Sequence, residues 1–169
     1  HGRGTANHFG LTDQVDLIMG TFSKSFASLG GFIAGDADVM HYVQHHARSF
    51  MFSASIPAAN VAAALAALDI MQNEPERIER LWKNTDKMRA GLKSLGFNTG
   101  HSTTPVIPII IGDDMKTVFA WNALFNEGVY TNTVIPPAVP PNKSLLRTSY
   151  MATHTEEQLD RVLEIFERV

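Results

Sequence analysis

Short apolar runs alternate with longer stretches in which apolar residues recur every three or four positions, and this alternation restricts the possible fold more than any other feature of the chain. A run of roughly four to eight apolar residues bounded by turn residues is typical of a strand, whereas the longer spacing is typical of a helix. The run 15–19 suits a buried strand of a parallel sheet, with 31–35 as its neighbour. The other expected strands cover residues 106–111, 129–133 and 145–150. Strands and helices in alternation predict an α/β or α+β architecture.

The helical stretches carry recognisable start and stop signals. Asp36 is a candidate N-cap for a helix of about a dozen residues. The stretch 58–72 is rich in alanine, which predicts a helix that packs closely inside the protein. A further helix is expected over residues 115–126. Thr155 and Gln158 form the capping-box pattern that predicts the start of the last helix.

The position of Pro75 suggests where the chain divides. Proline fits the first turn of a helix, and the apolar stripe that follows continues until Gly96. Trp82 lies on this stripe, so we expect it in the core. We therefore predict two domains, residues 1–74 and 75–169.

The composition excludes several classes of protein. The chain has 14 basic and 17 acidic residues, so a nucleic-acid binder that works through bulk positive charge is not expected. Hydrophobic residues make up 44% of the 169 positions, which is typical of a globular protein. No cysteine is present and no apolar run approaches the roughly 20 residues of a membrane-spanning helix. These properties predict a soluble, cytoplasmic protein.

The residues with the clearest chemical signal lie in the segment 20–25, with the sequence GTFSKS, directly after the first apolar run. A lysine at a strand end, screened from water by the core, has a lowered amine pKa and becomes nucleophilic. Neighbouring hydroxyls and glycine amides suit a phosphate. A lysine that forms an imine beside a phosphate cradle points to pyridoxal phosphate. A surface lysine in a serine-rich loop explains the same residues. The spacing alone does not distinguish a surface lysine from a cofactor-binding lysine.

The chain resembles the α-oxoamine synthases, because four of its motifs occur in the order that they have in this family. These fold-type-I pyridoxal-phosphate enzymes condense an amino acid with an acyl-CoA. The motifs are HGRGT at 1–5, GTFSKS at 20–25 with GGFIAGD at 30–36, FSASIP at 52–57, and LRTSYMATHT at 146–155. The resemblance implies an aspartate-aminotransferase-like α/β fold. Residues 1–74 then form the late part of the large cofactor domain, and residues 75–169 form the small C-terminal α+β domain.

The resemblance also assigns roles to individual residues. Lys24 matches the lysine that binds the cofactor as an imine and later removes the α-proton, and Thr21 matches the phosphate-binding threonine. Ser53 and Ser55 match a segment that reaches the cofactor phosphate of a partner subunit, which implies a homodimer. Arg147 matches the arginine that holds the amino-acid carboxylate, a task suited to a bidentate guanidinium.

Two further elements of the family pattern have no counterpart in the sequence. Members carry an Asp-x-x-His element and a ring-stacking histidine upstream of the glycine-rich turn, and this chain begins at His1 within that turn. We therefore expect the chain to be the C-terminal part of a longer enzyme and to lack activity in isolation. His41, His45 and His46 are close in sequence, but no third ligand accompanies them and no metal site is expected.

Within the family, the sequence most resembles the soluble bacterial serine palmitoyltransferases. The segments RSFMFSAS at 48–55, QNEP at 72–75 and PPAVP at 136–140 carry this resemblance. It implies that L-serine and palmitoyl-CoA are the substrates. The alternatives are 2-amino-3-ketobutyrate CoA ligase, 8-amino-7-oxononanoate synthase and a non-catalytic scaffold subunit of the same fold. Scaffold subunits typically lack the lysine, so Lys24 argues against the last of these.

Overall fold

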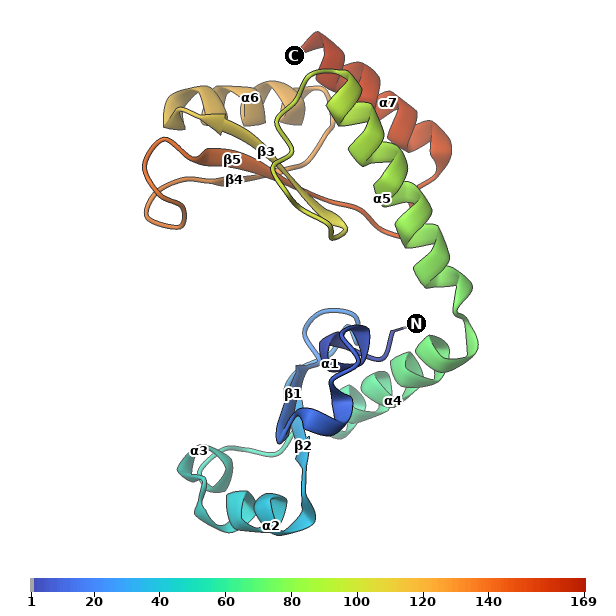
Figure 1. Ribbon diagram of the computed structural model, residues 1–169, viewed down its shortest axis with the longest axis vertical. Helices are drawn as coiled ribbons and strands as arrows, with labels where there is room; N and C mark the ends of the chain where they lie inside the picture. Colours follow the sequence, from blue (N-terminus) through green and yellow to red (C-terminus); the bar gives the residue numbers. More distant parts are fainter. Residues whose placement is uncertain (1) are drawn as a thin grey trace. The chain divides into compact units, whose positions relative to one another are not determined.

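The computed structural model describes residues 2–169, which divide into a first compact unit ending at Pro75 and a second beginning at Glu76 (Figure 1). His1, the first residue of the HGRGT motif, lies outside the described residues. Both units combine helices and strands, as the alternating pattern predicts. We describe each unit separately.

The first unit contains a two-stranded sheet. Its strands are β1 (Leu17–Thr21) and β2 (Gly31–Gly35), which pair antiparallel from Leu17 opposite Gly35 to Thr21 opposite Gly31. The prediction of a parallel arrangement is therefore wrong for this pair. The connection 22–30 explains the difference, because parallel neighbours need a crossover of about a dozen residues or more.

The prediction that this strand is buried is also wrong within the described chain. Met19 on β1 is 76% exposed. Exposed and half-buried residues alternate along β1, and every residue of β2 is exposed. A two-stranded sheet buries little surface by itself, so its apolar side chains depend on other elements for cover. The apolar run therefore identified the strand correctly but not its environment.

The two helices expected in the first unit are present, and three short helical segments occur in addition. They are α1 (Thr5–His8), the 3₁₀ turn η1 (Thr12–Gln14), α2 (Ala37–His46), α3 (Arg48–Met51) and α4 (Ala58–Asn73). Asp36 occupies the N-cap position of α2, although its side chain makes no capping hydrogen bond. The expected internal packing of α4 is not observed, because Ala64 is its one buried residue in the described chain and Leu65 is 62% exposed.

The second unit is a three-stranded antiparallel sheet with helices packed on one face (Figure 1). The strands β3 (Val106–Gly112), β4 (Asn132–Val134) and β5 (Ser144–Ser149) have the order β3-β5-β4, so β5 is central. The helices are α5 (Glu76–Ser94), α6 (Asp114–Asn126) and α7 (Glu156–Arg168). Their apolar side chains and the inward-facing residues of the strands form the core, which includes Met88, Leu92, Ile107, Ile109, Leu124, Leu146, Leu159, Ile165 and Phe166.

Most boundaries in the second unit agree with the sequence. Thr155 and Gln158 form the capping box of α7 through reciprocal side-chain to backbone hydrogen bonds, which confirms that prediction. Two expectations are wrong. The strand expected over 129–133 begins only at Asn132, and Trp82 is 40% exposed rather than part of the core. The buried positions of α5 begin two residues later, at Asn84, and include Thr85 and Met88.

Asn84 connects α5 to the segment that follows β5. Its buried amide donates hydrogen bonds to the carbonyl oxygens of Met151, at 2.9 Å, and His154, at 3.0 Å. The backbone amide of Met151 in turn donates to Nδ1 of His154, at 3.2 Å. These bonds fix the turn between β5 and α7.

The substitution Asn84→Ala is expected to destabilise the protein by about 2 kcal/mol, because it removes two hydrogen bonds that a buried amide makes to the backbone. The measurement is the free energy of unfolding of the full-length protein in urea. Asn126→Ala is a comparison on the same unit, since Asn126 is exposed and its side chain donates only to the side chain of Asn122. An equal effect of the two substitutions would contradict the role of Asn84.

Candidate functional site

Lys24 lies in the connection between β1 and β2, next to a cluster of hydroxyl groups. The hydroxyls of Thr21 and Ser23 are 2.9 Å apart, and the Thr21 hydroxyl accepts a hydrogen bond from the Ser23 amide at 3.3 Å. The Thr21 hydroxyl also donates to the Gly30 carbonyl, at 3.3 Å. The structure therefore brings two hydroxyls and one backbone amide together immediately before Lys24.

Backbone hydrogen bonds give this connection, which we call the lysine loop (residues 22–30), a defined shape. The amide of Phe22 donates to the Gly30 carbonyl, at 2.9 Å, and the amide of Ser28 donates to the Phe22 carbonyl, at 2.8 Å. The amide of Ala27 donates to the Lys24 carbonyl, at 3.0 Å, which turns the chain directly after the lysine. The Ser28 hydroxyl donates to the carbonyl of Asn60, at 2.7 Å, and so anchors the loop to α4.

Gly30 and Gly31, at the end of the lysine loop, allow the backbone to lie very close to two other groups. A Cβ atom at Gly31 would lie 2.4 Å from the carbonyl oxygen of Gly20 on the paired strand. Gly30 has a φ of +91°, and a Cβ atom there would lie 2.7 Å from Cδ1 of Ile56. A side chain at either position would therefore disturb the backbone that presents Thr21 and Lys24.

The environment of Lys24 differs from the sequence prediction in one respect. The side chain is exposed within the described chain, so these residues do not form the water-excluding surroundings that were expected around it. The position at the strand end is as expected. Lys24 is therefore placed by the loop but not buried by it.

Ser53 and Ser55 lie on the coil between α3 and α4. The Ser53 hydroxyl donates to the carbonyl of Ser49, and both serines are exposed. The next residue after Ser55, Ile56, packs against Gly30 at the end of the lysine loop. The coil that carries the two serines thus lies against the loop that carries Lys24.

Arg147 is the predicted site residue in the second unit. It lies on the central strand β5, where Leu146 and Thr148 point into the core and Arg147 points to the opposite, open face of the sheet. Among residues 2–169 its guanidinium has no ion-pair partner. An exposed, unpaired arginine on a rigid strand is suited to hold an external carboxylate.

Each unit has a hollow of its own. In the first unit a groove of about 1410 Å³ is lined by residues that include Gly20, Ser25 and Phe26. In the second unit a cavity of about 610 Å³ lies between α7 and the segments 127–131 and 148–151. Two of its buried hydroxyls, those of Thr131 and Tyr150, have no hydrogen-bond partner within the described residues, and burial raises the pKa of Tyr150 to about 12.

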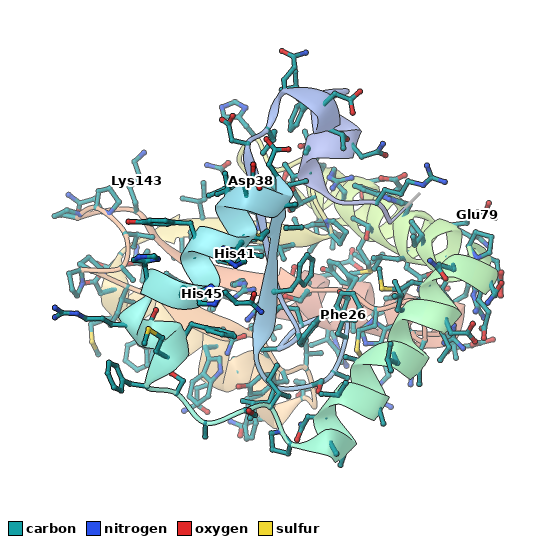
Figure 2. All side chains as sticks on the ribbon, turned by 90° about the horizontal axis from the view of Figure 1, so that it is seen from below. Phe26, Asp38, His41, His45, Glu79 and Lys143 are labelled. Carbon is teal, nitrogen blue, oxygen red and sulfur yellow. The ribbon has the colours of Figure 1, made fainter. Side chains whose placement is uncertain are left out.

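The histidines of α2 lie close together on the surface of the first unit. Figure 2 shows His41 and His45 on the same helix, where their ring centroids are 4.3 Å apart. Nδ1 of His45 is hydrogen-bonded to the His41 carbonyl, at 2.8 Å. Within the described part of the chain, no group of three or more potential metal ligands comes together. Among residues 2–169, none of the helices combines the length and the hydrophobicity that a membrane span requires.

Ser23 is a residue of the candidate site that the sequence analysis included among the neighbouring hydroxyls but did not single out. It belongs to the GTFSKS motif, and its hydroxyl pairs with that of Thr21 two positions earlier. The spacing of two hydroxyl residues before a lysine was the available signal. Asn132, which lies opposite Arg147 in the sheet, was missed because strand register is not visible in the sequence.

Comparisons with known proteins agree with these motifs. Residues 1–166 match the family model described as aminotransferase class I and II. The serine palmitoyltransferase of Sphingobacterium spiritivorum is 56% identical over 169 residues, which are 100% of this chain and 42% of that protein. The 8-amino-7-oxononanoate synthase of Symbiobacterium thermophilum is 44% identical over the same length, covering 43% of that protein.

The solved structures agree in fold. A serine palmitoyltransferase solved with PLP as its internal aldimine superposes with a TM-score of 0.94 at 36% identity, over 99% of this chain and 42% of the other. The similarities confirm the resemblance to the α-oxoamine synthases and the fold that it implies. The chain spans less than half the length of these relatives.

Proposed function

Because the chain belongs to the aminotransferase class I and II family, we propose that the full-length protein is a pyridoxal-phosphate-dependent acyltransferase that condenses L-serine with palmitoyl-CoA. The bond between Cα and the carboxylate of serine breaks to release CO₂, a bond forms between Cα and the acyl carbon, and CoA leaves as its thiol. The product is 3-ketodihydrosphingosine, a precursor of sphingolipids. The observation that carries the substrate assignment is the 56% identity to a serine palmitoyltransferase over the whole chain.

The residues of the lysine loop fit pyridoxal phosphate. A phosphate accepts hydrogen bonds, and the Thr21 and Ser23 hydroxyls, which here bond to Gly30 and to each other, can rotate to donate to it instead. Lys24 follows directly, and its exposed amine is free to condense with the cofactor aldehyde. When bound, the cofactor supplies an electron sink for the bonds at the amino-acid Cα.

The remaining roles belong to the side chains of the chain itself. Lys24 accepts the α-proton of the amino acid at Nζ, and Arg147 holds the amino-acid carboxylate. Ser53 and Ser55 contribute hydroxyls that bind a cofactor phosphate. In a homodimer, this phosphate belongs to the cofactor of the partner subunit. The homodimer follows from the family resemblance and the cytoplasmic location from the composition, and both stay predictions.

A substrate panel with the full-length protein tests the assignment. We expect kcat/KM for L-serine with palmitoyl-CoA to exceed that for glycine with acetyl-CoA or alanine with pimeloyl-CoA by at least about 10²-fold, because a mismatched polar group or chain length in a fitted site costs a few kcal/mol. The measurement is CoA release for each amino acid with each acyl-CoA. A preference for alanine with pimeloyl-CoA would support an 8-amino-7-oxononanoate synthase, whose relative is 44% identical. Turnover with no pair would contradict the enzyme assignment.

A further inference from the structure

The open face of the sheet places a specific set of side chains around Arg147. The register puts Asn132 of β4 directly opposite Arg147 on one side and Pro108 of β3 opposite it on the other. Directly opposed residues in an antiparallel pair have Cβ atoms about 5 Å apart and point to the same face. Asn132 is therefore the cross-strand neighbour of Arg147 that carries a polar side chain.

A neighbouring tyrosine holds the Asn132 side chain. Nδ2 of Asn132 donates a hydrogen bond to the hydroxyl of Tyr130, at 3.3 Å, and the two residues are two positions apart. The ring of Tyr130 meets that of Phe125 on α6 edge to face, with centroids 6.5 Å apart. The tyrosine accepts one N–H of the amide, and the second N–H has no hydrogen-bond partner among residues 2–169.

The charge balance of this face favours an anion. Arg147 contributes one positive charge, and the residues directly opposite it, Asn132 and Pro108, are uncharged. Neighbours on its own strand and the same face are Leu145 and Ser149, which are also uncharged. A carboxylate has two oxygens that each accept hydrogen bonds, so it can be bound by a guanidinium and by a further N–H donor together.

We propose that Asn132 is a second binding residue for the amino-acid carboxylate, acting beside Arg147, with Tyr130 as the residue that positions its amide. This inference rests on the proposed function, which assigns the carboxylate to Arg147, and adds a donor from the neighbouring strand. The contact is to the carboxylate, so it serves every amino acid that the site accepts. The acyl-CoA substrate is not involved in it.

The test measures the KM values of the full-length holoenzyme for L-serine, L-alanine and palmitoyl-CoA, together with serine affinity by calorimetry. For Asn132→Ala we expect the serine KM and dissociation constant to rise about tenfold, the loss typical of a hydrogen bond to a charged group. The alanine KM rises by the same factor, and the palmitoyl-CoA KM stays within about twofold. Asn132→Asp, which opposes a carboxylate to a carboxylate, weakens serine binding further. Tyr130→Phe has a smaller effect in the same direction.

Thr133→Ala is the matched control, because Thr133 is exposed on the same short strand but alternates to the other face. It is expected to leave both amino-acid KM values unchanged. The proposal is overturned if Asn132→Ala changes the serine KM by less than twofold, if Thr133→Ala has the same effect, or if the loss is confined to serine, which would indicate a contact to its hydroxyl. If Arg147→Ala raises the amino-acid KM and Asn132→Ala does not, the second donor alone is refuted. If neither does, the carboxylate site of the proposed function also fails.

Discussion

Replacing Lys24 by alanine in the full-length protein is expected to lower turnover by at least about 10³-fold. The substitution removes the amine that binds the cofactor covalently and the base that accepts the α-proton, and general-base catalysis alone contributes about 10²–10⁴-fold. The measurement is CoA release from palmitoyl-CoA in the presence of L-serine. A second measurement is borohydride reduction followed by mass spectrometry, which attaches the cofactor to residue 24 in the unmodified protein and to no residue in the variant.

The same variant separates loss of chemistry from loss of the site. Thr21, Ser23 and the backbone of the lysine loop remain in place, so non-covalent cofactor binding is expected to persist. A small external amine, such as methylamine, is expected to restore part of the proton transfer. Lys93→Ala is the matched control, because Lys93 is an exposed lysine in the last turn of α5. Turnover of the Lys24→Ala protein comparable to that of the control would contradict the assignment.

Local sequence signals predicted the elements well where each signal acts within one element. The capping box at Thr155 and the alanine-rich helix α4 (Ala58–Asn73) appear where expected. The same signals could not give the direction of β2 relative to β1, or the exposure of Met19 and Leu65. Strand direction and exposure depend on how segments distant in sequence pack together. The apolar pattern of a strand or helix is the same whichever segment covers its side chains.

The candidate site, too, could be predicted from the sequence only in part. The GTFSKS motif placed Thr21 at the end of a strand and Lys24 three residues later in the following loop, because this spacing is local. It could not show that the Ser23 hydroxyl pairs with Thr21, or that Ile56 brings the Ser55 coil against Gly30. Asn132 gave no signal of its own, since only the register between β4 and β5 sets it opposite Arg147.

The substitution Arg147→Ala is expected to raise the KM for L-serine by about 10²-fold and to leave the KM for palmitoyl-CoA within about twofold. A guanidinium on a strand can form two parallel hydrogen bonds to a carboxylate, and such charge-assisted bonds are worth roughly twice a neutral one. The palmitoyl chain and CoA do not share this contact. The kinetic measurement is paired with cofactor binding, followed by its absorbance, which is expected to be unchanged.

Arg147→Lys decides whether charge or geometry matters at this position. A lysine keeps the positive charge but offers no planar pair of donors, so we expect it to recover only part of the loss in serine binding. The open face of β5 leaves room for either side chain without repacking the core, because the buried residues Leu146 and Thr148 point the other way. Full recovery by lysine would show that a point charge is sufficient. Equal losses for serine, palmitoyl-CoA and the cofactor would instead indicate a general structural role for Arg147 and contradict the proposed carboxylate site.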